Sequence, residues 1–515
     1  MSSELENLRP LEGDYLSADP AFSSLLRKLA GPEAAKRLEE RLLPFARLAA
    51  GRWNTLAEKI ANDYTGPRIE AYGPTGERRD DIWLPPPARQ LRRETVEAGV
   101  LTNESRLEEF AKVYFLGHLG ESSLTCPLAC TAGLIRVMEH KGSAFLKEHY
   151  LPRLRSAETP LAGAQFITEQ DCGSDIGALK ARAVPNDGGN PPSRWKLYGE
   201  KWFCSAIDEY FLIAARPEGA PAGTDGVGIF FVPRLLDGRL NDLKIKRLKS
   251  KIGTRELPTA EIELEGATAY NIGPVTEGFK NLMNDVINTS RLMNAAAALG
   301  MTARAALEAE NYTRQRSAFG RTIAEYPLVR ESLGHIRDLL SRRRALFFHL
   351  ISEINQKPQT NPSTHEAVWQ RTLINLCKYR TAIGATEAVH EAILLLAGNG
   401  TIETFSILPR LYRDSLVIET WEGTHNTLAL QVARDGMRFP FAQRLKEETL
   451  PRAARIRSRG DGKKADWIEN ETKHLEEDLK KLDDSHWVES EARRLIDRLG
   501  SVLETAVFED LQNSR

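Results

Sequence analysis

The order of its helical and strand-like segments constrains this chain more than any other feature. Residues 20–165 are mainly helical, with apolar residues recurring at three- and four-residue steps. Residues 161–275 consist of short runs rich in β-branched and aromatic residues, separated by turn-forming stretches. Helical periodicity returns at Gly278. Because helices and strands are segregated along the chain, the sequence predicts an α+β fold and argues against a doubly wound parallel sheet.

These changes of texture predict four regions in the 515 residues, where length alone favours about three or four domains. The regions are a helical N-terminal domain (1–160), a central β-barrel or sandwich domain (161–275), a C-terminal four-helix bundle (276–440) and a charged helical extension (441–515). Long amphipathic segments carry the assignment of the bundle.

Composition narrows the class of protein. Apolar residues make up 41%, charged residues 27%, and the net charge is −1, so nothing in the overall balance indicates nucleic acid or an anionic membrane. No apolar run reaches the length of a membrane span, and MSSELENLRPLEGDYL resembles neither a signal peptide nor a basic transit peptide. The odd number of cysteines, without zinc or disulfide spacing, indicates reduced thiols in a cytoplasmic protein and predicts no metal site (Cys126, Cys130, Cys172, Cys204, Cys377).

Two stretches of the strand-rich region could carry chemistry. FITEQDCGSDIG (166–177) gathers hydroxyl side chains and glycines, which suit a cofactor edge or a phosphate, although a polar turn has the same composition. YGEKWFCSA (198–206) places Trp202 and Phe203 beside Ser205. Such residues could cover a flat ring and donate to it, and packing in the core of a sheet is the alternative.

Two charged residues of the helical region are also candidates. Arg291, beside an alanine-rich helix, could pair with a buried carboxylate or a ligand phosphate, or lie on the surface. Glu422, in ETWEGTHNTLALQVARD (419–435), is expected in a turn between Trp421 and Gly423, with Thr424 as the N-cap of the next helix. That helix start would favour a phosphate, whereas a capping or surface carboxylate is the alternative for Glu422.

Taken together and in this order, these motifs resemble the flavin-dependent acyl-CoA dehydrogenase family over roughly residues 105–435. TEQDCGSD and GEKWFCSA are similar to its flavin segments, RQRSAFGRTI to its Arg-x-x-Phe-Gly segment, LLAGNGTIETFSILPRLYRD to its Gly-x-Gly segment, and WEGTHN to the segment of its catalytic base. RLKSKIGTRELPTAEIEL, LPRLYRDSLVIETWEG and the C-terminal extension resemble the alkylation-response, AidB-like branch. The family fold is a helical domain, a β domain and a four-helix bundle.

The resemblance implies an FAD-dependent α,β-desaturation of an acyl-CoA thioester. Glu422 would remove the α proton, and its backbone N–H, with a flavin hydroxyl, would hold the thioester oxygen. The implied cofactor-binding residues are Phe166, Thr168, Ser174, Phe203, Ser205, Arg316, Phe319, Gly398, Trp421, Thr424 and Asn426. The implied substrate-binding residues are Ser174, Arg291 and Gly423. Leu394, Ala318 and Asn288 depart from the family pattern.

The resemblance also implies partners. A homotetramer would pass electrons to an electron-transfer flavoprotein, and oxygen as the acceptor remains open. An alternative is a DNA-associated AidB-like stress-response flavoprotein with weak dehydrogenase activity. Residues 441–515 hold roughly as many basic as acidic residues, so DNA binding is not favoured. Packing of the extension on the bundle is the favoured prediction, and pairing with another subunit is a further one.

Overall fold

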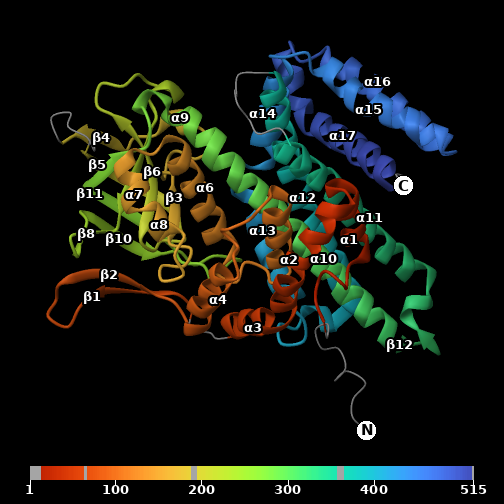
Figure 1. Ribbon diagram of the computed structural model, residues 1–515, viewed down its shortest axis with the longest axis horizontal. Helices are drawn as coiled ribbons and strands as arrows, with labels where there is room; N and C mark the ends of the chain where they lie inside the picture. The colour runs from red at the N-terminus through yellow and green to blue at the C-terminus, as the bar shows by residue number, and fades with distance from the viewer. Residues whose placement is uncertain (1–12, 63–65, 187–193, 357–364, 513–515) are drawn as a thin grey trace, which may run out of the picture. The chain divides into compact units, whose positions relative to one another are not determined.

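A computed structural model of the chain describes residues 13–62, 66–186, 194–356 and 365–512 (Figure 1). The chain divides into two compact units. Unit 1 comprises residues 1–54, 103–120 and 291–515, and unit 2 comprises residues 55–102 and 121–290. The region 1–160 therefore contributes to both units. The first twelve residues, on which the prediction about targeting peptides depends, lie outside the described residues, as does most of the turn PNDGGNPPS.

Unit 2 contains the predicted β domain, and its sheet closes on itself. β5 and β7 flank β11, β4 pairs with β5, and β6 pairs with both β4 and β7, while β10 and β3 extend the ring. The α+β prediction with a central barrel is confirmed. The strands are β3 (Gly163–Phe166), β4 (Arg182–Pro185), β5 (Arg194–Ser205), β6 (Tyr210–Pro217), β7 (Gly228–Pro233), the short β8 (Leu235–Leu236) and β9 (Arg239–Leu240), β10 (Leu243–Leu248) and β11 (Thr259–Asn271).

Helices complete the core of unit 2. β7 is buried along its whole length, as expected of a strand covered on both faces. Leu134, Val137 and Met138 of α6 (Thr125–Lys141) belong to the same apolar cluster as Leu212 and Phe231 of the barrel. The other helices of the unit are α3 (Asn54–Asn62, which begins at the last residue of unit 1), α4 (Pro86–Glu97), α7 (Ala144–His149), α8 (Leu151–Leu154) and α9 (Gly278–Asn281).

One hairpin of unit 2 lies in a region that the sequence assigned mainly to helix. β1 (Arg68–Tyr72) pairs with β2 (Arg78–Trp83) on either side of YGPTG. The hairpin is fixed to β10 by long-range hydrogen bonds: Ile245 N–H donates to Asp80 Oδ2 (2.9 Å), and Arg78 donates to the Ile245 carbonyl (2.9 Å). Local periodicity carries no information about such tertiary contacts, which explains why the hairpin was not predicted.

All long secondary-structure elements described in unit 1 are α-helices. They are α1 (Pro20–Ala30), α2 (Pro32–Leu48), α5 (Arg106–Gly117), most of α10 (Asn288–Gln315), α11 (Pro327–Gln356), α12 (His365–Leu396), α13 (Leu408–Thr420), α14 (His425–Gly436), α15 (Phe441–Ser458), α16 (Gly462–Leu479) and α17 (Ser485–Gln512). A short hairpin separates α10 from α11. Its two strands, β12 (Ser317–Ala318) and β13 (Arg321–Thr322), have two residues each. The predicted helical bundle is confirmed, with α13 as an additional helix.

Small residues let the helices of unit 1 approach closely. A Cβ atom on Gly117 of α5 would lie 2.3 Å from the Ala297 carbonyl oxygen of α10, and one on Gly300 would lie 2.1 Å from the Tyr114 carbonyl oxygen. These distances are shorter than any real contact, so only glycine fits this crossing. Further along α10, Ala305 and Ala309 lie in the same buried cluster as alanines of α12. The alanine-rich sequence of α10 thus reflects close helix packing.

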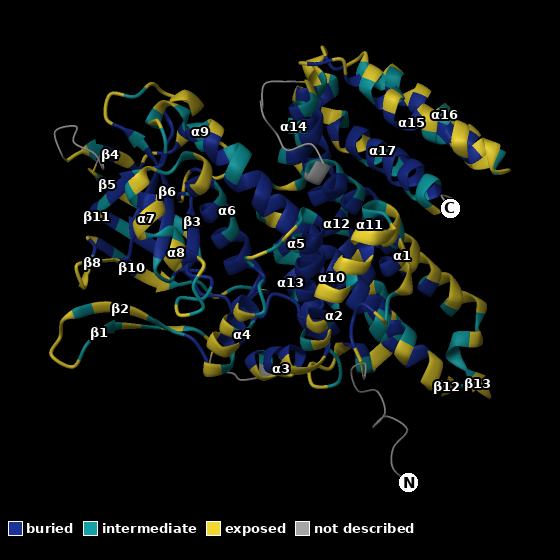
Figure 2. Cartoon of the chain, viewed as in Figure 1, coloured by how far each residue is buried: buried dark blue, intermediate teal, exposed yellow. Residues whose placement is uncertain are grey.

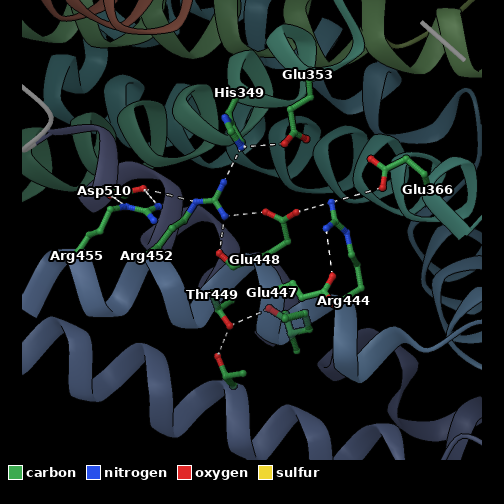
Figure 3. Close-up of polar contacts among 12 residues, drawn as sticks. His349, Glu353, Glu366, Arg444, Glu447, Glu448, Thr449, Arg452, Arg455 and Asp510 are labelled. Carbon is green, nitrogen blue, oxygen red and sulfur yellow. Dashed lines mark hydrogen bonds and ion pairs between the residues drawn. The ribbon is translucent and has the colours of Figure 1, made fainter. Parts of the chain in front are cut away.

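The C-terminal extension packs against the bundle, as predicted. Arg380 of α12 donates to both carboxylate oxygens of Glu504 on α17 (2.9 and 3.0 Å), and Tyr379 donates to Asp497 (2.9 Å). Figure 2 shows buried residues along α17 and exposed ones over much of α15 and α16. A second set of polar contacts joins α15 to α11 (Figure 3). Among the described residues, no helix combines the length and apolar character needed to cross a bilayer.

Candidate active site

The turn between α13 and α14, residues 421–424, carries Glu422 and is called the base turn below. α13 ends at Thr420 and α14 begins at His425, so Glu422 lies between helices, as predicted. Its backbone is left-handed (φ 60°), and Gly423 follows with φ 105°. A left-handed non-glycine residue is strained and persists only where its surroundings enforce it.

Two buried cations hold the main chain of the base turn. Arg291 of α10 donates from Nε to the Glu422 carbonyl oxygen (2.9 Å) and from Nη1 to the Asn375 side-chain oxygen (2.5 Å). Lys378 of α12 donates to the carbonyl oxygens of Glu419 and Gly423, both at 2.9 Å. Arg291 is 3% exposed and Lys378 is 0% exposed. The two residues, called the clamp below, thus bind carbonyl oxygens before, at and after the candidate base.

Burial dominates the electrostatics of the clamp. It lowers the pKa of Lys378 to about 7, reinforced by the positive charge of Arg291 and opposed by the negative charges of Glu422 and Glu419. Burial also lowers the pKa of Arg291 to about 10, and Glu422 again opposes the shift. Desolvation disfavours the charged form of a cation. The site therefore places the Glu422 carboxylate near two cations, whose charges the nearby carboxylates offset only in part.

Trp421 and Thr424 flank the candidate base. The Trp421 indole N–H is buried and has no hydrogen-bond partner in the structure, and a buried donor of this kind costs free energy unless a ligand accepts from it. Thr424 is the N-cap of α14, as predicted, but makes no side-chain capping bond, because its hydroxyl contacts that of Thr427 (3.0 Å). The first amides of α14 therefore lack the usual cap and suit an anion.

Asn426, a predicted phosphate contact, is joined to the C-terminal extension. Arg493 of α17 donates to the Asn426 side-chain oxygen (3.3 Å) and to the Tyr379 hydroxyl (3.0 Å). The Tyr379 ring lies edge-on to His425 at 5.2 Å between centroids. The extension thus contacts the first turn of the helix that follows the base turn.

The predicted cofactor residues of unit 2 differ in their exposure. Phe203 is 52% exposed on β5, and Ser205 is half-buried, with its hydroxyl 3.0 Å from that of Thr259. Phe166 is fully buried on β3, where its ring packs against Phe211 at 4.7 Å. Thr168 is half-buried and Ser174 is exposed. Phe203 and Ser205 therefore offer the accessible surface, whereas Phe166 is a core residue whose predicted cofactor role stays a prediction.

A buried ion pair supports the segment that contains Thr168 and Ser174. Lys201 donates to Glu169 Oε1 (2.8 Å), and both side chains are buried. Glu169 also accepts from the backbone N–H groups of Lys180 (2.6 Å) and Ala181 (3.0 Å). The two motifs TEQDCGSD and GEKWFCSA, which are separate in sequence, are thus joined through one carboxylate.

Three further predicted residues lie at the surface of unit 1. Phe319, at the tip of the β12–β13 hairpin, is 96% exposed, and Arg316 beside it is also exposed. Gly398 is exposed in the 3-10 turn after α12. A Cβ atom there would meet open space. Within unit 1 the structure brings Arg291, Glu422 and Gly423 together.

Sequence analysis missed Lys378 and Asn375. Both lie in α12, which is buried around much of its circumference. Their signal was the occurrence of an amide and an ammonium three residues apart within LINLCKYRTAIG, an otherwise apolar stretch. A lysine is almost never fully buried unless it has a partner, so its position in such a stretch indicates a specific one.

Comparison with known proteins identifies the family. Residues 164–267 match the acyl-CoA dehydrogenase middle domain, and residues 276–437 match the acyl-CoA dehydrogenase C-terminal domain. Together these matches span about half of the chain. The chain belongs to the acyl-CoA dehydrogenase family. The matches include the barrel and the helices α10–α14, so the base turn lies inside the C-terminal family domain.

Individual relatives cover more of this dehydrogenase-family chain. Acyl-CoA dehydrogenase family member 11 of Caenorhabditis elegans is 29% identical over 493 residues, 91% of this chain and 78% of that protein. The putative acyl-CoA dehydrogenase AidB of Escherichia coli is 32% identical over 270 residues, 52% of this chain and 47% of AidB. The resemblance to the family and to AidB is confirmed.

Solved structures share the fold. Caenorhabditis elegans ACDH-11, in a complex with C11-CoA, superposes with a TM-score of 0.86 at 25% identity, covering 98% of this chain and 89% of that one. An acyl-CoA dehydrogenase of Bacillus anthracis complexed with FAD superposes with a TM-score of 0.69 at 20% identity, covering 82% and 76%.

Proposed function

We propose that this protein is an FAD-dependent acyl-CoA dehydrogenase that desaturates an acyl-CoA thioester between its α and β carbons, with Glu422 as the base. The observation that carries the proposal is the base turn itself. A carboxylate stands on a left-handed residue whose main chain two buried cations hold. Family membership and a C11-CoA complex of ACDH-11 support an acyl-CoA substrate.

The chemistry assigns a role to this chain's residues at each end of the reaction. Glu422 takes the weakly acidic α proton, which requires an ionised carboxylate in a water-poor site. The backbone N–H of Glu422 would donate to the thioester oxygen, where negative charge develops. Gly423, a proposed substrate contact, has the positive φ of the turn, and Arg291 fixes the base through the carbonyl of Glu422. FAD, when bound, supplies the acceptor for the β hydride.

Each unit offers residues whose chemistry suits part of a flavin dinucleotide. The buried, unpartnered indole N–H of Trp421 offers a donor, and the uncapped start of α14 offers amides to a diphosphate. On unit 2, the exposed Phe203 and the hydroxyl of Ser205 offer an aromatic face and a donor. Thr168, Ser174, Arg316, Phe319, Gly398 and Asn426 remain proposed contacts, as does Phe166 through its main chain.

The AidB-like alternative, a DNA-associated protein with weak dehydrogenase activity, has a basic run as its candidate surface. The arginines of that run on α15 are already paired. Arg455 contacts Asp510 (2.5 Å), and Arg457 contacts both Asp466 (2.5 Å) and Glu469 (2.5 Å). Paired arginines release few counterions from DNA. This pairing favours the enzyme.

Partners and compartment follow from the proposed reaction. Reduced flavin must return its electrons, and an electron-transfer flavoprotein is the proposed acceptor. The exposed Phe319 and the half-exposed Leu394 support a homotetramer, because large apolar side chains at a surface indicate contacts between subunits. All five cysteines are buried and unpaired, which supports a reducing compartment such as the cytoplasm.

An anaerobic titration tests the proposal. The purified yellow protein is mixed with saturated acyl-CoA thioesters of increasing length and branching while flavin absorbance is followed, and the products are analysed for the enoyl thioester. Bleaching with formation of one enoyl product per flavin is expected. A flavin inert to every thioester, in a protein that shifts on DNA, would overturn the proposal in favour of the AidB-like alternative.

A further inference from the structure

Lys378 is a buried ammonium that donates hydrogen bonds to main-chain carbonyl groups. It lies in the middle of α12 with no exposed surface. Its Nζ donates to the carbonyl oxygens of Glu419 and Gly423, which lie on either side of Glu422. Among the described residues, its hydrogen bonds go to these carbonyl groups rather than to a carboxylate. The ammonium therefore connects the end of α13 to the residue after the base.

The position of the ammonium solves a local problem of the fold. The last carbonyl groups of a helix lack intrahelical partners, and Glu419 belongs to the last turn of α13. The chain then reverses through two residues with positive φ, Glu422 and Gly423. A cation at a helix C-terminus complements the negative end of the helix dipole. One buried lysine thus satisfies both the helix end and the strained turn.

We propose that Lys378 is a positioning residue for the dehydrogenation: its ammonium holds residues 419–423 so that Glu422 faces the reacting α carbon and stays ionised until it takes the proton. This inference rests on the proposed function, and it assigns to α12 a role that the base-turn motif does not include. Lys378 does not touch the substrate. Its effect is transmitted through the main chain of Glu422 and through its charge.

The charged groups around Lys378 come from three neighbouring helices and from the base turn. Arg291 lies on α10, Glu419 on α13, Glu422 on the base turn and His425 on α14. Arg291 disfavours the charge on Lys378, whereas the two glutamates favour it. His425 is neutral near pH 7, because burial and the cations lower its pKa to about 4. The ammonium is therefore charged below neutral pH. This is the acidic limb of the pH profile, the range in which the bleaching rate falls as the pH is lowered.

The test compares Lys378→Met with Lys378→Gln and with a matched control, Lys112→Met. Lys112 of α5 is also a buried lysine, but it pairs with Glu108 (2.8 Å), which retains Arg41 after the substitution. Three quantities are measured on the flavin-loaded protein: the rate of flavin bleaching by saturating acyl-CoA across pH, the affinity for a non-reactive thioether analogue of acyl-CoA, and amide hydrogen exchange over residues 419–424.

We expect Lys378→Met to slow bleaching about 10- to 100-fold, as misplaced catalytic groups do, while the affinity for the analogue changes less than threefold. The acidic limb should move to higher pH, because a carboxylate that loses a neighbouring cation protonates more readily. Exchange over 419–424 should accelerate. Lys378→Gln keeps an N–H donor without the charge. It should bring amide exchange over 419–424 back toward the wild-type rate more than it brings back the wild-type pH midpoint of bleaching. Lys112→Met should leave all three unchanged.

Two results would overturn the inference. One is a folded Lys378→Met or Lys378→Gln protein that keeps both the wild-type bleaching profile and wild-type exchange at the base turn. The other is an equal loss in Lys112→Met, which would indicate a general effect of removing a buried lysine. If none of the thioesters tested bleaches the flavin of the wild-type protein, the proposed function fails instead. Exchange at the base turn then still reports whether Lys378 holds it, so the two failures are distinguishable.

Discussion

The base turn and the contacts between α15 and α11 both hold positive charge away from most of the solvent, buried in the first and half-buried in the second, but they balance it differently. In the base turn, Arg291 and Lys378 donate to carbonyl and amide oxygens. In the α15 network, defined as His349 and Glu353 of α11, Arg444, Glu448 and Arg452 of α15, and Asp510 of α17, arginines face carboxylates and an imidazole (Figure 3).

Arg452 is at the centre of the α15 network. It donates to Glu448 Oε2 (2.7 Å) and to His349 Nε2 (2.7 Å). One ligand atom each from His349, Glu353 and Glu448 lie within 4.8 Å of one another, which is metal-like spacing. The guanidinium of Arg452 already contacts two of these three groups, so it supplies the positive charge there.

The difference indicates what each region does. Ion pairs between arginines and carboxylates commonly join structural elements. The two charges of a pair largely cancel, so the pair exerts little electric field on other groups. The cations of the base turn donate to neutral oxygens, and burial lowers the pKa of Lys378 to about 7, so below that pH its full charge acts on Glu422. We therefore expect substitutions in the α15 network to change stability and substitutions in the base turn to change the rate of reaction.

The largest effect on stability is expected for Arg452→Met. The substitution removes two short hydrogen bonds of Arg452, to Glu448 and to His349, although Glu448 keeps Arg444 and Asp510 keeps Arg455. Hydrogen bonds to charged groups contribute about 1.5–3 kcal/mol each, so we expect a loss of about 3 kcal/mol. Urea unfolding measures the loss, with Arg455→Met as the control. Arg455 lies on the same helix and also pairs with Asp510, but its side chain is 48% exposed, so it should cost about 1 kcal/mol or less. A large loss of bleaching rate in folded Arg452→Met protein would break the comparison.

The second effect is a pH dependence that originates at His349. Burial and the charge of Arg452 lower the pKa of His349 to about 4, compared with about 6.5 in the unfolded chain. The unfolded state thus binds a proton first, and stability should fall as pH drops from about 6.5 to about 4, by roughly 3 kcal/mol. Glu353, whose pKa burial raises, offsets part of the loss. The free energy of unfolding should depend less steeply on pH in His349→Gln than in the wild-type protein. An unchanged slope would show that His349 is not the origin.

The third effect concerns the backbone of the base turn. Gly423→Ala places a Cβ atom 3.1 Å from Leu428 and 3.4 Å from Arg291 at φ 105°, a conformation that costs a residue with a side chain about 1–3 kcal/mol. We expect a modest loss of stability and a clear loss of bleaching rate. Gly334→Ala on α11, where a Cβ meets open space and φ is not positive, is the control. Equal rates in both variants would show that the geometry of the turn does not matter.

Much of the fold could be predicted because its signals are local. The segregated periodicities indicated the barrel and the helices, and the position of Gly423 after Glu422 indicated a turn before α14. The β1–β2 hairpin was missed because Asp80 and Arg78 bind β10, far away in sequence.

The candidate site was predictable only in part. Glu422 and Arg291 were found through motifs, but Lys378 and Asn375 were not, because their partners lie on other elements. Lys378 donates to main-chain carbonyl groups of α13 and the base turn, and Asn375 accepts from Arg291 of α10. Asn426 and Arg493 show the same limit: no local pattern connects α14 with α17. Motifs therefore identify the reacting group, whereas the residues that hold it become visible only after folding.

The most direct test of the account is the bleaching rate of Glu422→Gln with the thioester that wild-type protein oxidises fastest. The amide keeps the size of the side chain and the main-chain contacts of the clamp, but it cannot accept the α proton. We predict a rate about 10²–10⁴-fold lower, with thioester binding retained. Glu403→Gln, which changes an exposed carboxylate paired with Arg413, should bleach normally. Bleaching of Glu422→Gln at the wild-type rate would contradict the account.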